Sequence, residues 1–301
     1  MILALVGPTA TGKTALAVDT ANALAARGLP AEIVNGDSML VYRGMDIGTA
    51  KPTIEERGGV PHHLIDVLDI TQTASVAQFQ GWARAAIADC EARGVVPIVV
   101  GGSALYVHAI LDEMDFPATD AAVRARWEAE LARVGPAALH GELARRDPGA
   151  AAAILPGNGR RIVRALEAIE LTGSFQAHLP PPVYALPGVV QIGLAIERDE
   201  LDARIEARVV GMWDDGLVDE VRRLEALGLR DGLTASRALG YRQVLAFLDG
   251  HMSEMEAKAA TAQATRRFAR KQMSWFRRDG RIAWHRFDEP LLGEAMSKMA
   301  A

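Results

Sequence analysis

The sequence has little cysteine, since Cys90 is the only one among its 301 residues. A single cysteine excludes an intrachain disulfide and any metal site built from several thiolates. We interpret Cys90 as a small buried residue of a helix, in a protein kept in a reducing cytosol. No apolar run approaches the ~18 residues of a membrane span, and no basic segment precedes the first apolar run, so a signal peptide is not predicted. We therefore expect a cytoplasmic protein with no membrane partner.

Excess positive charge is also missing. The formal net charge of −5 at pH 7 provides no general attraction to nucleic acid, so any such binding must come from local clusters of Lys and Arg. Half of the residues are hydrophobic and 24% are charged, which is typical of a globular chain with a substantial core.

The most informative stretch is GPTATGKT, which follows the apolar run at residues 1–6 and precedes an Ala- and Leu-rich segment at 15–26. The pattern G-x-x-x-x-G-K-[ST] between a strand and a helix is the P-loop motif. Its glycines let backbone N–H groups converge on an anion, and the helix N-terminus adds positive potential. We expect Lys13 to reach a terminal phosphate oxygen and the Thr14 hydroxyl to reach Mg²⁺. The predicted diphosphate- or triphosphate-binding residues are Gly7, Pro8, Thr9, Ala10, Thr11, Gly12, Lys13 and Thr14.

A carboxylate follows the second predicted strand. Residues 31–34 (AEIV) read as a strand, and Asp37 comes shortly after its end. Ligands of parallel α/β sheets bind beyond the carboxyl ends of the strands, so Asp37 is expected on the same edge as the P-loop. There it could hold Mg²⁺ or accept a proton from the attacking group. The alternative is that it caps a following helix.

The third apolar strand, residues 95–100 (VVPIVV), ends without the carboxylate that P-loop ATPases and GTPases usually use for Mg²⁺. This absence argues against a motor or a switch, and it favours a kinase-like or other transferase use of the loop. His62 and His63 are adjacent and therefore point in different directions on a regular element, so we favour a structural role over a metal site.

The region after residue 112 differs in character. Residues 124–145 and 156–172 are predicted to be charged helices, and PPP at 180–182 precedes another strand at 189–196. We therefore predict an α/β fold, with a P-loop, nucleotide-kinase-like parallel sheet and a mainly helical insertion domain. The predicted core comprises residues 1–112 and 188–301, and the insertion comprises residues 113–187.

A basic helix is predicted towards the end of the chain. At about 100° per residue, Arg266, Arg270 and Arg277 share one face, with Arg267, Lys271 and Arg278 beside it and no acid before Asp279. A polyanion is a natural partner for such a face, and an ordinary solvated helix is the alternative. Phe268, Trp275 and Phe276 fall on the opposite side, so we expect them to anchor the helix in the core.

Taken together, these motifs resemble those of bacterial tRNA dimethylallyltransferases. The matching stretches are GPTATGKT at 7–14, DSMLVYRGMDIGTAKP at 37–52, PHHLID at 61–66, VGGSALY at 100–106, RRIVRALE at 160–167, GYRQ at 240–243 and TRRFARKQMSWFR at 265–277. They extend over nearly the whole chain. Two departures are mild: Leu40 stands where many members have Gln, and Ser103 where most have Thr.

The resemblance implies transfer of a dimethylallyl group from dimethylallyl diphosphate to the N6 amine of the adenosine 3′ of the anticodon, in tRNAs that read codons beginning with U. Asp37 would accept the proton of the amine, Thr9 would line the pocket, and Lys13 and Arg242 would bind the diphosphate with Mg²⁺ held by Thr14. The resemblance also implies a monomer.

The resemblance further implies contacts with the anticodon stem-loop of tRNA, in three parts of the chain. They are Asp37, Ser38, Met39, Leu40 and Ser103; then Arg124, Arg160, Arg161 and Arg164; then Arg237, Gly240, Tyr241, Arg242, Arg266, Arg270, Lys271, Gln272, Trp275 and Arg277. Three alternatives stay open from the residues themselves: a small-molecule P-loop kinase, an isopentenyltransferase acting on free AMP or ADP, and a non-catalytic RNA-binding P-loop protein.

Overall fold

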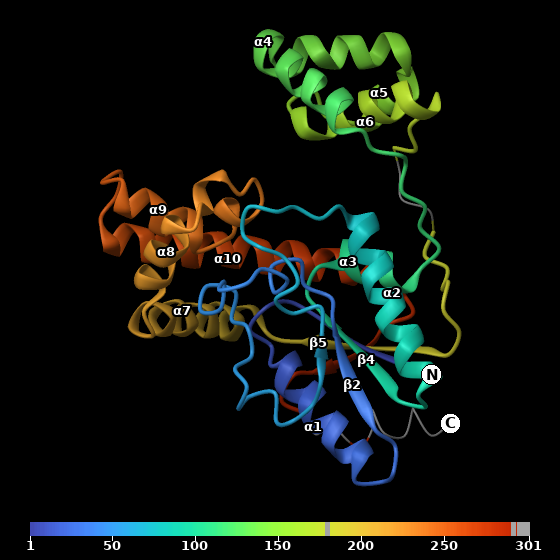
Figure 1. Cartoon of the computed structure of the whole chain (residues 1–301), viewed down its shortest axis with the longest axis vertical. Helices are drawn as coiled ribbons and strands as arrows, with labels where there is room; N and C mark the ends of the chain where they lie inside the picture. The colour runs from blue at the N-terminus through green and yellow to red at the C-terminus, as the bar shows by residue number, and fades with distance from the viewer. Residues whose placement is uncertain (178–180, 290–292, 294–301) are drawn as a thin grey trace. The chain divides into compact units, whose positions relative to one another are not determined.

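The computed structural model describes residues 1–177, 181–289 and 293. The chain divides into two compact units, one formed by Met1–Glu113 with Tyr184–Ala301 and the other by Met114–Val183 (Figure 1). The second unit thus begins and ends slightly inside the insertion predicted at 113–187. Of the predicted break at 180–182, Pro180 lies outside the described residues.

The first unit is built on one parallel sheet of six strands in the order β3-β2-β4-β1-β5-β6. The strands are β1 (Ile2–Val6), β2 (Ala31–Asn35), β3 (His62–His63), β4 (Val96–Gly101), β5 (Val189–Ala195) and β6 (Ala283–Arg286). All pairings are parallel, so the predicted α/β class is confirmed. The two edge strands β3 and β6 were not predicted, because they are short and only partly buried.

Alternate side chains of the central strand enter two different cores. Leu3 and Leu5 pack with Ala17, Val18 and Leu24 of α1 (Lys13–Ala25). Ile2, Ala4 and Val6 face the opposite core, to which the other helices of this unit contribute. These are α2 (Val76–Ala92), α3 (Ala104–Leu111), α7 (Arg198–Asp214), α8 (Leu217–Ala226), α9 (Tyr241–Leu248) and α10 (Glu254–Phe276), with the short 3₁₀ segments Leu229–Asp231 and Ala235–Arg237 beside them. Period-2 alternation in a buried strand therefore produces the helix–sheet–helix layers.

The second unit is helical and has its own core. It contains α4 (Ala121–Arg146), α5 (Pro148–Ala153) and α6 (Gly159–Thr172), and α4 is kinked at Gly135, whose φ is 78°. Leu139, Leu143, Ile162 and Leu166 are buried there. The predicted helices are thus present, and α5 is the short one that was not predicted.

The prediction for the aromatic residues of α10 was wrong in two of three cases. Phe276 is buried at 1% exposure, whereas Phe268 and Trp275 are 40% and 41% exposed. The buried stripe of α10 runs through Thr261, Ala269, Gln272 and Phe276. Phe268 and Trp275 each precede a member of that stripe by one position, so the helical rotation carries them to its rim.

Among the described residues, no helix has the length and apolar character needed to cross a bilayer.

Candidate active site

The P-loop lies between β1 and α1, as predicted. Gly7 and Gly12 have φ angles of 143° and 85°, and a Cβ on Gly7 would lie 2.8 Å from Leu194 O of the neighbouring strand. The loop thus needs glycine at both positions. Lys13 begins α1, and its Nζ donates to Pro8 O at 2.6 Å. The first turn of a 13-residue helix therefore faces the space in front of the loop, where its free N–H groups favour an anion.

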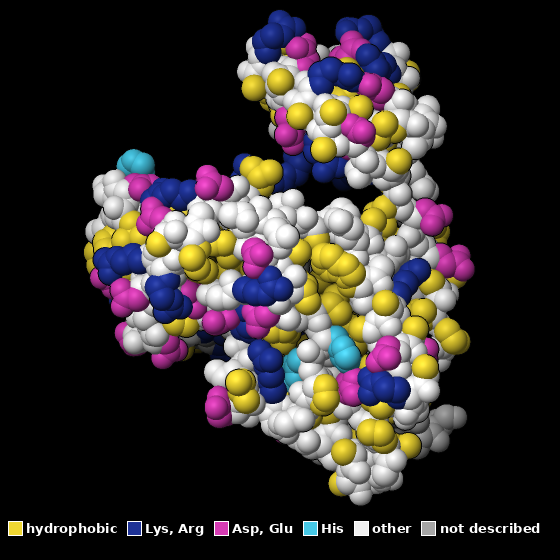
Figure 2. Space-filling model, in the orientation of Figure 1, with side chains coloured by type: hydrophobic (Ala, Val, Ile, Leu, Met, Phe, Trp, Pro, Cys, Tyr) yellow, Lys and Arg dark blue, Asp and Glu magenta, His cyan; other side chains and the backbone are white. Residues whose placement is uncertain are grey.

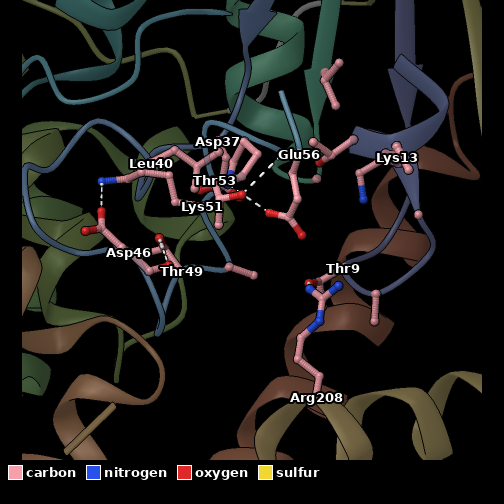
Figure 3. A pocket seen from close by; sticks show the side chains of 18 of the residues that line it. Thr9, Lys13, Asp37, Leu40, Asp46, Thr49, Lys51, Thr53, Glu56 and Arg208 are labelled. Carbon is pink, nitrogen blue, oxygen red and sulfur yellow. Dashed lines mark hydrogen bonds and ion pairs between the residues drawn. The ribbon is translucent and has the colours of Figure 1, made fainter. Parts of the chain in front are cut away.

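A cavity of about 990 Å³ opens at this end of the sheet, and all of its lining residues belong to the first unit. Thr9, Lys13 and Arg208 point into it from one side, while the loop that carries Asp46 and Thr49 forms the other (Figure 3). Asp37 also lines it. The structure therefore brings the P-loop and the predicted carboxylate into one cavity.

Burial destabilises the charged forms of two cations in this cavity, Lys13 and Arg208. Burial, followed by the charge of Arg208, lowers the pKa of Lys13 to about 7, and Asp37 partly offsets both effects. Burial and the nearby Arg204 likewise lower the pKa of Arg208. Two partly desolvated cations side by side gain stabilisation when an anion arrives. The cavity is therefore suited to a ligand of high negative charge.

Asp37 has the electrostatics expected of a proton acceptor. Burial raises the pKa of its carboxyl group, opposed by a hydrogen bond from Met39 N and by the charge of Lys13. The bond from Met39 N to Asp37 Oδ1 is 2.8 Å long and holds the carboxylate in place. Asp37 lines the cavity as predicted, but the alternative that it caps a following helix was wrong, because its bond to Met39 lies in a bend and no helix begins in the described chain between it and α2.

The sequence did not identify two arginines of α7 that contact the P-loop. Arg208 Nη1 donates to Thr9 Oγ1 at 3.2 Å, and Arg204 Nε donates to Ala10 O at 2.8 Å. The predicted second diphosphate-binding cation, Arg242, is instead exposed on α9 and is not among the described residues that line the cavity. Only the packing of α7 beside the P-loop distinguishes Arg208 from the other arginines of the chain.

Comparison with known proteins identifies the family. A family model described as IPP transferase matches residues 40–279. The chain belongs to the IPP transferase family. It is 64% identical over 290 residues to a tRNA dimethylallyltransferase of Thermobifida fusca, covering 96% of this chain and 91% of that protein. It is 63% identical over 285 residues to one from Kineococcus radiotolerans, covering 94% and 90%. The predicted family and enzyme class are thus confirmed.

Solved structures of this family share the fold. The full-length tRNA isopentenylpyrophosphate transferase of Bacillus halodurans matches with a TM-score of 0.71 and 42% identity, covering 99% of this chain and 94% of that one. A eukaryotic dimethylallyltransferase acting on tRNA matches with a TM-score of 0.75 over 99% of this chain and 77% of its own. At 22% identity the latter shows the fold alone. The P-loop fold predicted from the sequence is therefore that of the IPP transferases.

Three residues expected from the family motifs to touch tRNA are buried. Gln272 is 5% exposed, and its Oε1 accepts a hydrogen bond from Thr9 N at 3.0 Å. Tyr241 is fully buried, and its hydroxyl donates to Glu220 Oε1 at 2.6 Å. Gly240 is also buried, and its N–H donates a hydrogen bond to Gln243 Oε1 at 3.0 Å. The sequence did not indicate that these three residues are buried, because their burial depends on how distant elements pack.

The arginines predicted to meet tRNA in the second unit fall into two groups. Arg124 and Arg164 both bind Glu167, which is fully buried, at 2.9 and 3.0 Å. Their first role is therefore to neutralise a carboxylate in the core of this unit. Arg160 and Arg161 are exposed, and Arg161 also donates to Ala177 O.

The remaining predicted contacts belong to the first unit. Leu40 lines the cavity beside Asp37, Ser38 and Met39 follow Asp37 in the same loop, and Ser103 is the N-cap residue of α3. Arg237, Arg270, Lys271, Trp275 and Arg277 are exposed. Arg266 is paired with Glu206 of α7, so the expectation that this face has no acid nearby was wrong. The partner is distant in sequence, and on the face seen in Figure 2 basic and acidic side chains are interspersed.

Oxygen ligands for a hard cation are available in the cavity. Thr14 lies beside Lys13 at the start of α1, and Asp37 and Glu56 line the same space. Hydroxyl and carboxylate oxygens are the donors that Mg²⁺ prefers, so this donor set fits the predicted ion.

A second group with metal-ligand chemistry lies at the sheet edge, where Glu32, His63 and Cys90 have donor atoms within 4.8 Å of one another. Arg93 already binds both Glu32 oxygens at 2.7 Å. The bond to Arg93 lowers the pKa of Glu32 to about 2, and burial raises the pKa of Cys90 to about 12. Glu32 and Arg93 therefore form an ion pair, and the neighbouring Cys90 keeps its thiol proton, so the group is better explained as an ion-pair network than as a metal site. His62 instead contacts Val60 O at 2.8 Å, so the two histidines do have different partners.

Proposed function

We propose that this chain transfers a dimethylallyl group from dimethylallyl diphosphate to the N6 amine of the adenosine 3′ of the anticodon, in tRNAs that read codons beginning with U. The observation that carries the proposal is the cavity in which Asp37 shares one space with Lys13 and Arg208. A diphosphate needs the cations, and an amine that loses a proton needs the carboxylate. The names of the relatives support tRNA as the acceptor.

The first step is departure of the diphosphate. Negative charge grows on the diphosphate as the allylic C–O bond breaks, and fixed cations at that position lower the barrier. We assign this role to Lys13 and Arg208 together with the P-loop amides, and their place in one cavity supports it. The hydrogen bond from Arg208 to Thr9 Oγ1 orients the guanidinium before substrate binds. Thr14 would hold Mg²⁺, which would supply further positive charge to the leaving group.

The second step is removal of a proton from the amine. An exocyclic amine of adenine is a weak nucleophile, so a base must accept its proton as the C–N bond forms. We assign this role to Asp37, and the hydrogen bond that Met39 N donates to its Oδ1, which holds the carboxylate in place, supports the assignment. The adenosine must leave its stack to reach the cavity, as base-modifying enzymes generally require.

The charge for tRNA binding comes from local groups, since the net charge is −5. We assign this role to the exposed Arg237, Arg270, Lys271 and Arg277 of the first unit and to Arg160 and Arg161 of the second. A cytoplasmic monomer suits this reaction. Contacts with phosphates make binding depend on salt, so the affinity for the anticodon stem-loop should fall steeply as salt rises.

One assay tests the proposal directly. The protein is incubated with Mg²⁺ and radiolabelled dimethylallyl diphosphate, together with either undermodified tRNA or AMP. We expect label in the tRNA and none in AMP. Asp37→Asn should reduce turnover by ~10²-fold or more while leaving tRNA affinity unchanged. Asp219→Asn, a change at a carboxylate that is 75% exposed, is the control. Transfer to AMP alone, or ATP-dependent phosphorylation, would identify one of the alternative activities.

A further inference from the structure

Three consecutive backbone N–H groups of the cavity loop bind one buried carboxylate. Glu220, on α8, is 1% exposed. Its Oε2 accepts from Asp46 N at 3.1 Å and from Ile47 N at 2.8 Å, and its Oε1 accepts from Gly48 N at 3.3 Å. Such successive N–H groups form a concave anion site. Here its occupant is a side chain of the same chain, more than 170 positions away.

Tyr241 contacts both Glu220 and the loop. Its hydroxyl donates to Glu220 Oε1 at 2.6 Å, and its ring packs so closely on the loop that a Cβ added to Gly48 would lie 2.5 Å from Tyr241 Cε2. Burial and the charge of Glu220 raise the pKa of Tyr241, so the hydroxyl stays protonated and remains a donor. The Glu220 carboxylate therefore receives four hydrogen bonds, and the absence of a side chain at Gly48 is explained.

The same loop is held at its other end by Lys51. Lys51 Nζ, on a side chain that is 3% exposed, contacts Tyr42 O at 2.8 Å, Asp46 Oδ1 at 2.7 Å and Asp66 Oδ1 at 2.6 Å. Hydrogen bonds therefore hold the loop at both ends. Between them, the loop lines the cavity through Asp46, Ile47, Thr49 and Ala50.

We propose that Glu220 and Tyr241 are positioning residues that hold residues 46–48 as one wall of the dimethylallyl diphosphate cavity. Tyr241 acts from inside the protein and makes no contact with tRNA, although it belongs to a motif expected to bind it. This inference rests on the proposed function for the identity of the ligand. The hydrogen bonds themselves do not depend on it.

Two variants remove the bonds with little change in shape. Tyr241→Phe keeps the ring against Gly48 and removes only the hydroxyl. Glu220→Gln keeps the volume but replaces one acceptor oxygen with an NH₂ group, which cannot accept from the loop. Glu220→Gln leaves a loop N–H without its acceptor, and Tyr241→Phe leaves the Glu220 carboxylate with one donor fewer. A buried polar group that loses its partner is destabilised, so the amides of residues 46–48 should open more often.

Hydrogen exchange on the full chain measures this opening. In both variants, exchange in a peptide covering residues 42–52 should rise by about tenfold or more, while the P-loop peptide at 7–14 stays as in the wild type. In the transfer assay, the KM for dimethylallyl diphosphate should rise by about three- to tenfold, with the Kd for tRNA changed by less than twofold.

A matched pair of glycine variants supplies a second route if Glu220→Gln folds poorly. Gly48→Ala pushes a methyl group into the Tyr241 ring and should reproduce both effects. Gly81→Ala on α2, where no atom lies within 4 Å of the added Cβ, should cause neither. Unchanged exchange at 42–52, an equal rise in every peptide, or a weaker tRNA Kd with an unchanged diphosphate KM would overturn the proposal. If the wild type transfers no label, the proposed function fails, and the exchange result still decides the positioning role.

Discussion

Gln272 Oε1 accepts a hydrogen bond from the backbone N–H of Thr9 at 3.0 Å, joining α10 to the P-loop across 263 positions of sequence. The amide also lies against Gly102, where an added Cβ would be 2.6 Å from Gln272 Nε2. The side chain therefore fills the space between two loops at the ends of β1 and β4. A helix whose exposed face is basic thus carries, on its buried face, a support for the P-loop.

Replacing Gln272 should weaken diphosphate binding more than tRNA binding. Gln272→Leu removes the acceptor and leaves Thr9 N unpaired, at a cost of ~1–3 kcal/mol. We expect the KM for dimethylallyl diphosphate to rise by about tenfold with little change in the Kd for tRNA. Lys271→Ala, at the exposed neighbouring position, should show the reverse pattern. Steady-state kinetics and filter binding separate the two, and a selective loss of tRNA affinity in Gln272→Leu would refute the support role.

The pH dependence of diphosphate binding should follow Lys13. Its pKa of about 7 means that the ammonium is progressively lost as pH rises above 7. A bound diphosphate favours the charged form and raises this pKa, so binding should take up protons at pH 8 and affinity should decline there. Calorimetry in buffers of different ionisation enthalpy measures the uptake. Lys13→Arg, whose side chain stays charged, should abolish it, and equal uptake in that variant would rule out Lys13 as its source.

The acid side of the rate profile should follow Asp37. Burial raises the pKa of this carboxyl group, so the base becomes protonated, and turnover falls, at a higher pH than for an ordinary aspartate. The profile of kcat/KM should therefore have an acid limb from Asp37 and an alkaline limb from Lys13. Asp37→Asn should have little activity and no acid limb. An acid limb that persists in the residual activity of this variant would point to another base.

Substitution should distinguish the two arginines that could bind the diphosphate, Arg208 and Arg242. Arg208 lies in the cavity and contacts Thr9, whereas Arg242 is exposed on α9. Arg208→Gln should reduce kcat/KM for dimethylallyl diphosphate by ~10²–10³-fold, because a cation near the leaving group is lost. Arg242→Gln is the matched variant and should leave that parameter within a fewfold of the wild type. The opposite ranking would restore the role that the sequence suggested for Arg242.

Arg281 should be required for stability. It binds Asp112 and Asp279, whose side chains are 3% and 2% exposed, at 2.6 and 2.7 Å. Arg281→Ala removes the guanidinium from two buried carboxylates, although Asp112 keeps its contact with His108 at 2.6 Å, so the free energy of unfolding should fall by about 3–5 kcal/mol. Urea denaturation measures the loss. Arg286→Ala, which breaks an ion pair that is half exposed on both sides, should change stability far less, and equal effects would contradict the argument.

Local sequence pattern by itself determined much of this protein. The P-loop could be recognised because its function depends on glycines, a lysine and a hydroxyl at fixed spacing on one continuous turn. Asp37 could be placed because the carboxyl ends of parallel strands meet at one edge of a sheet. The strands β3 and β6 were not predicted, because two and four residues are too few to show the alternation of buried and exposed side chains. Each of them is stabilised by pairing with its neighbouring strand.

Only the tertiary structure decided which side chains serve the site. Arg208 and Arg242 are both arginines on amphipathic helices, and nothing local ranks them; the packing of α7 against the P-loop does. Tyr241 and Gln272 belong to stretches that resemble family motifs and were expected to touch tRNA, yet both are buried. Glu206 neutralises Arg266 from another helix. The physical reason is the same in each case: contacts between elements distant in sequence depend on how the elements pack, and a one-dimensional pattern carries no record of that packing.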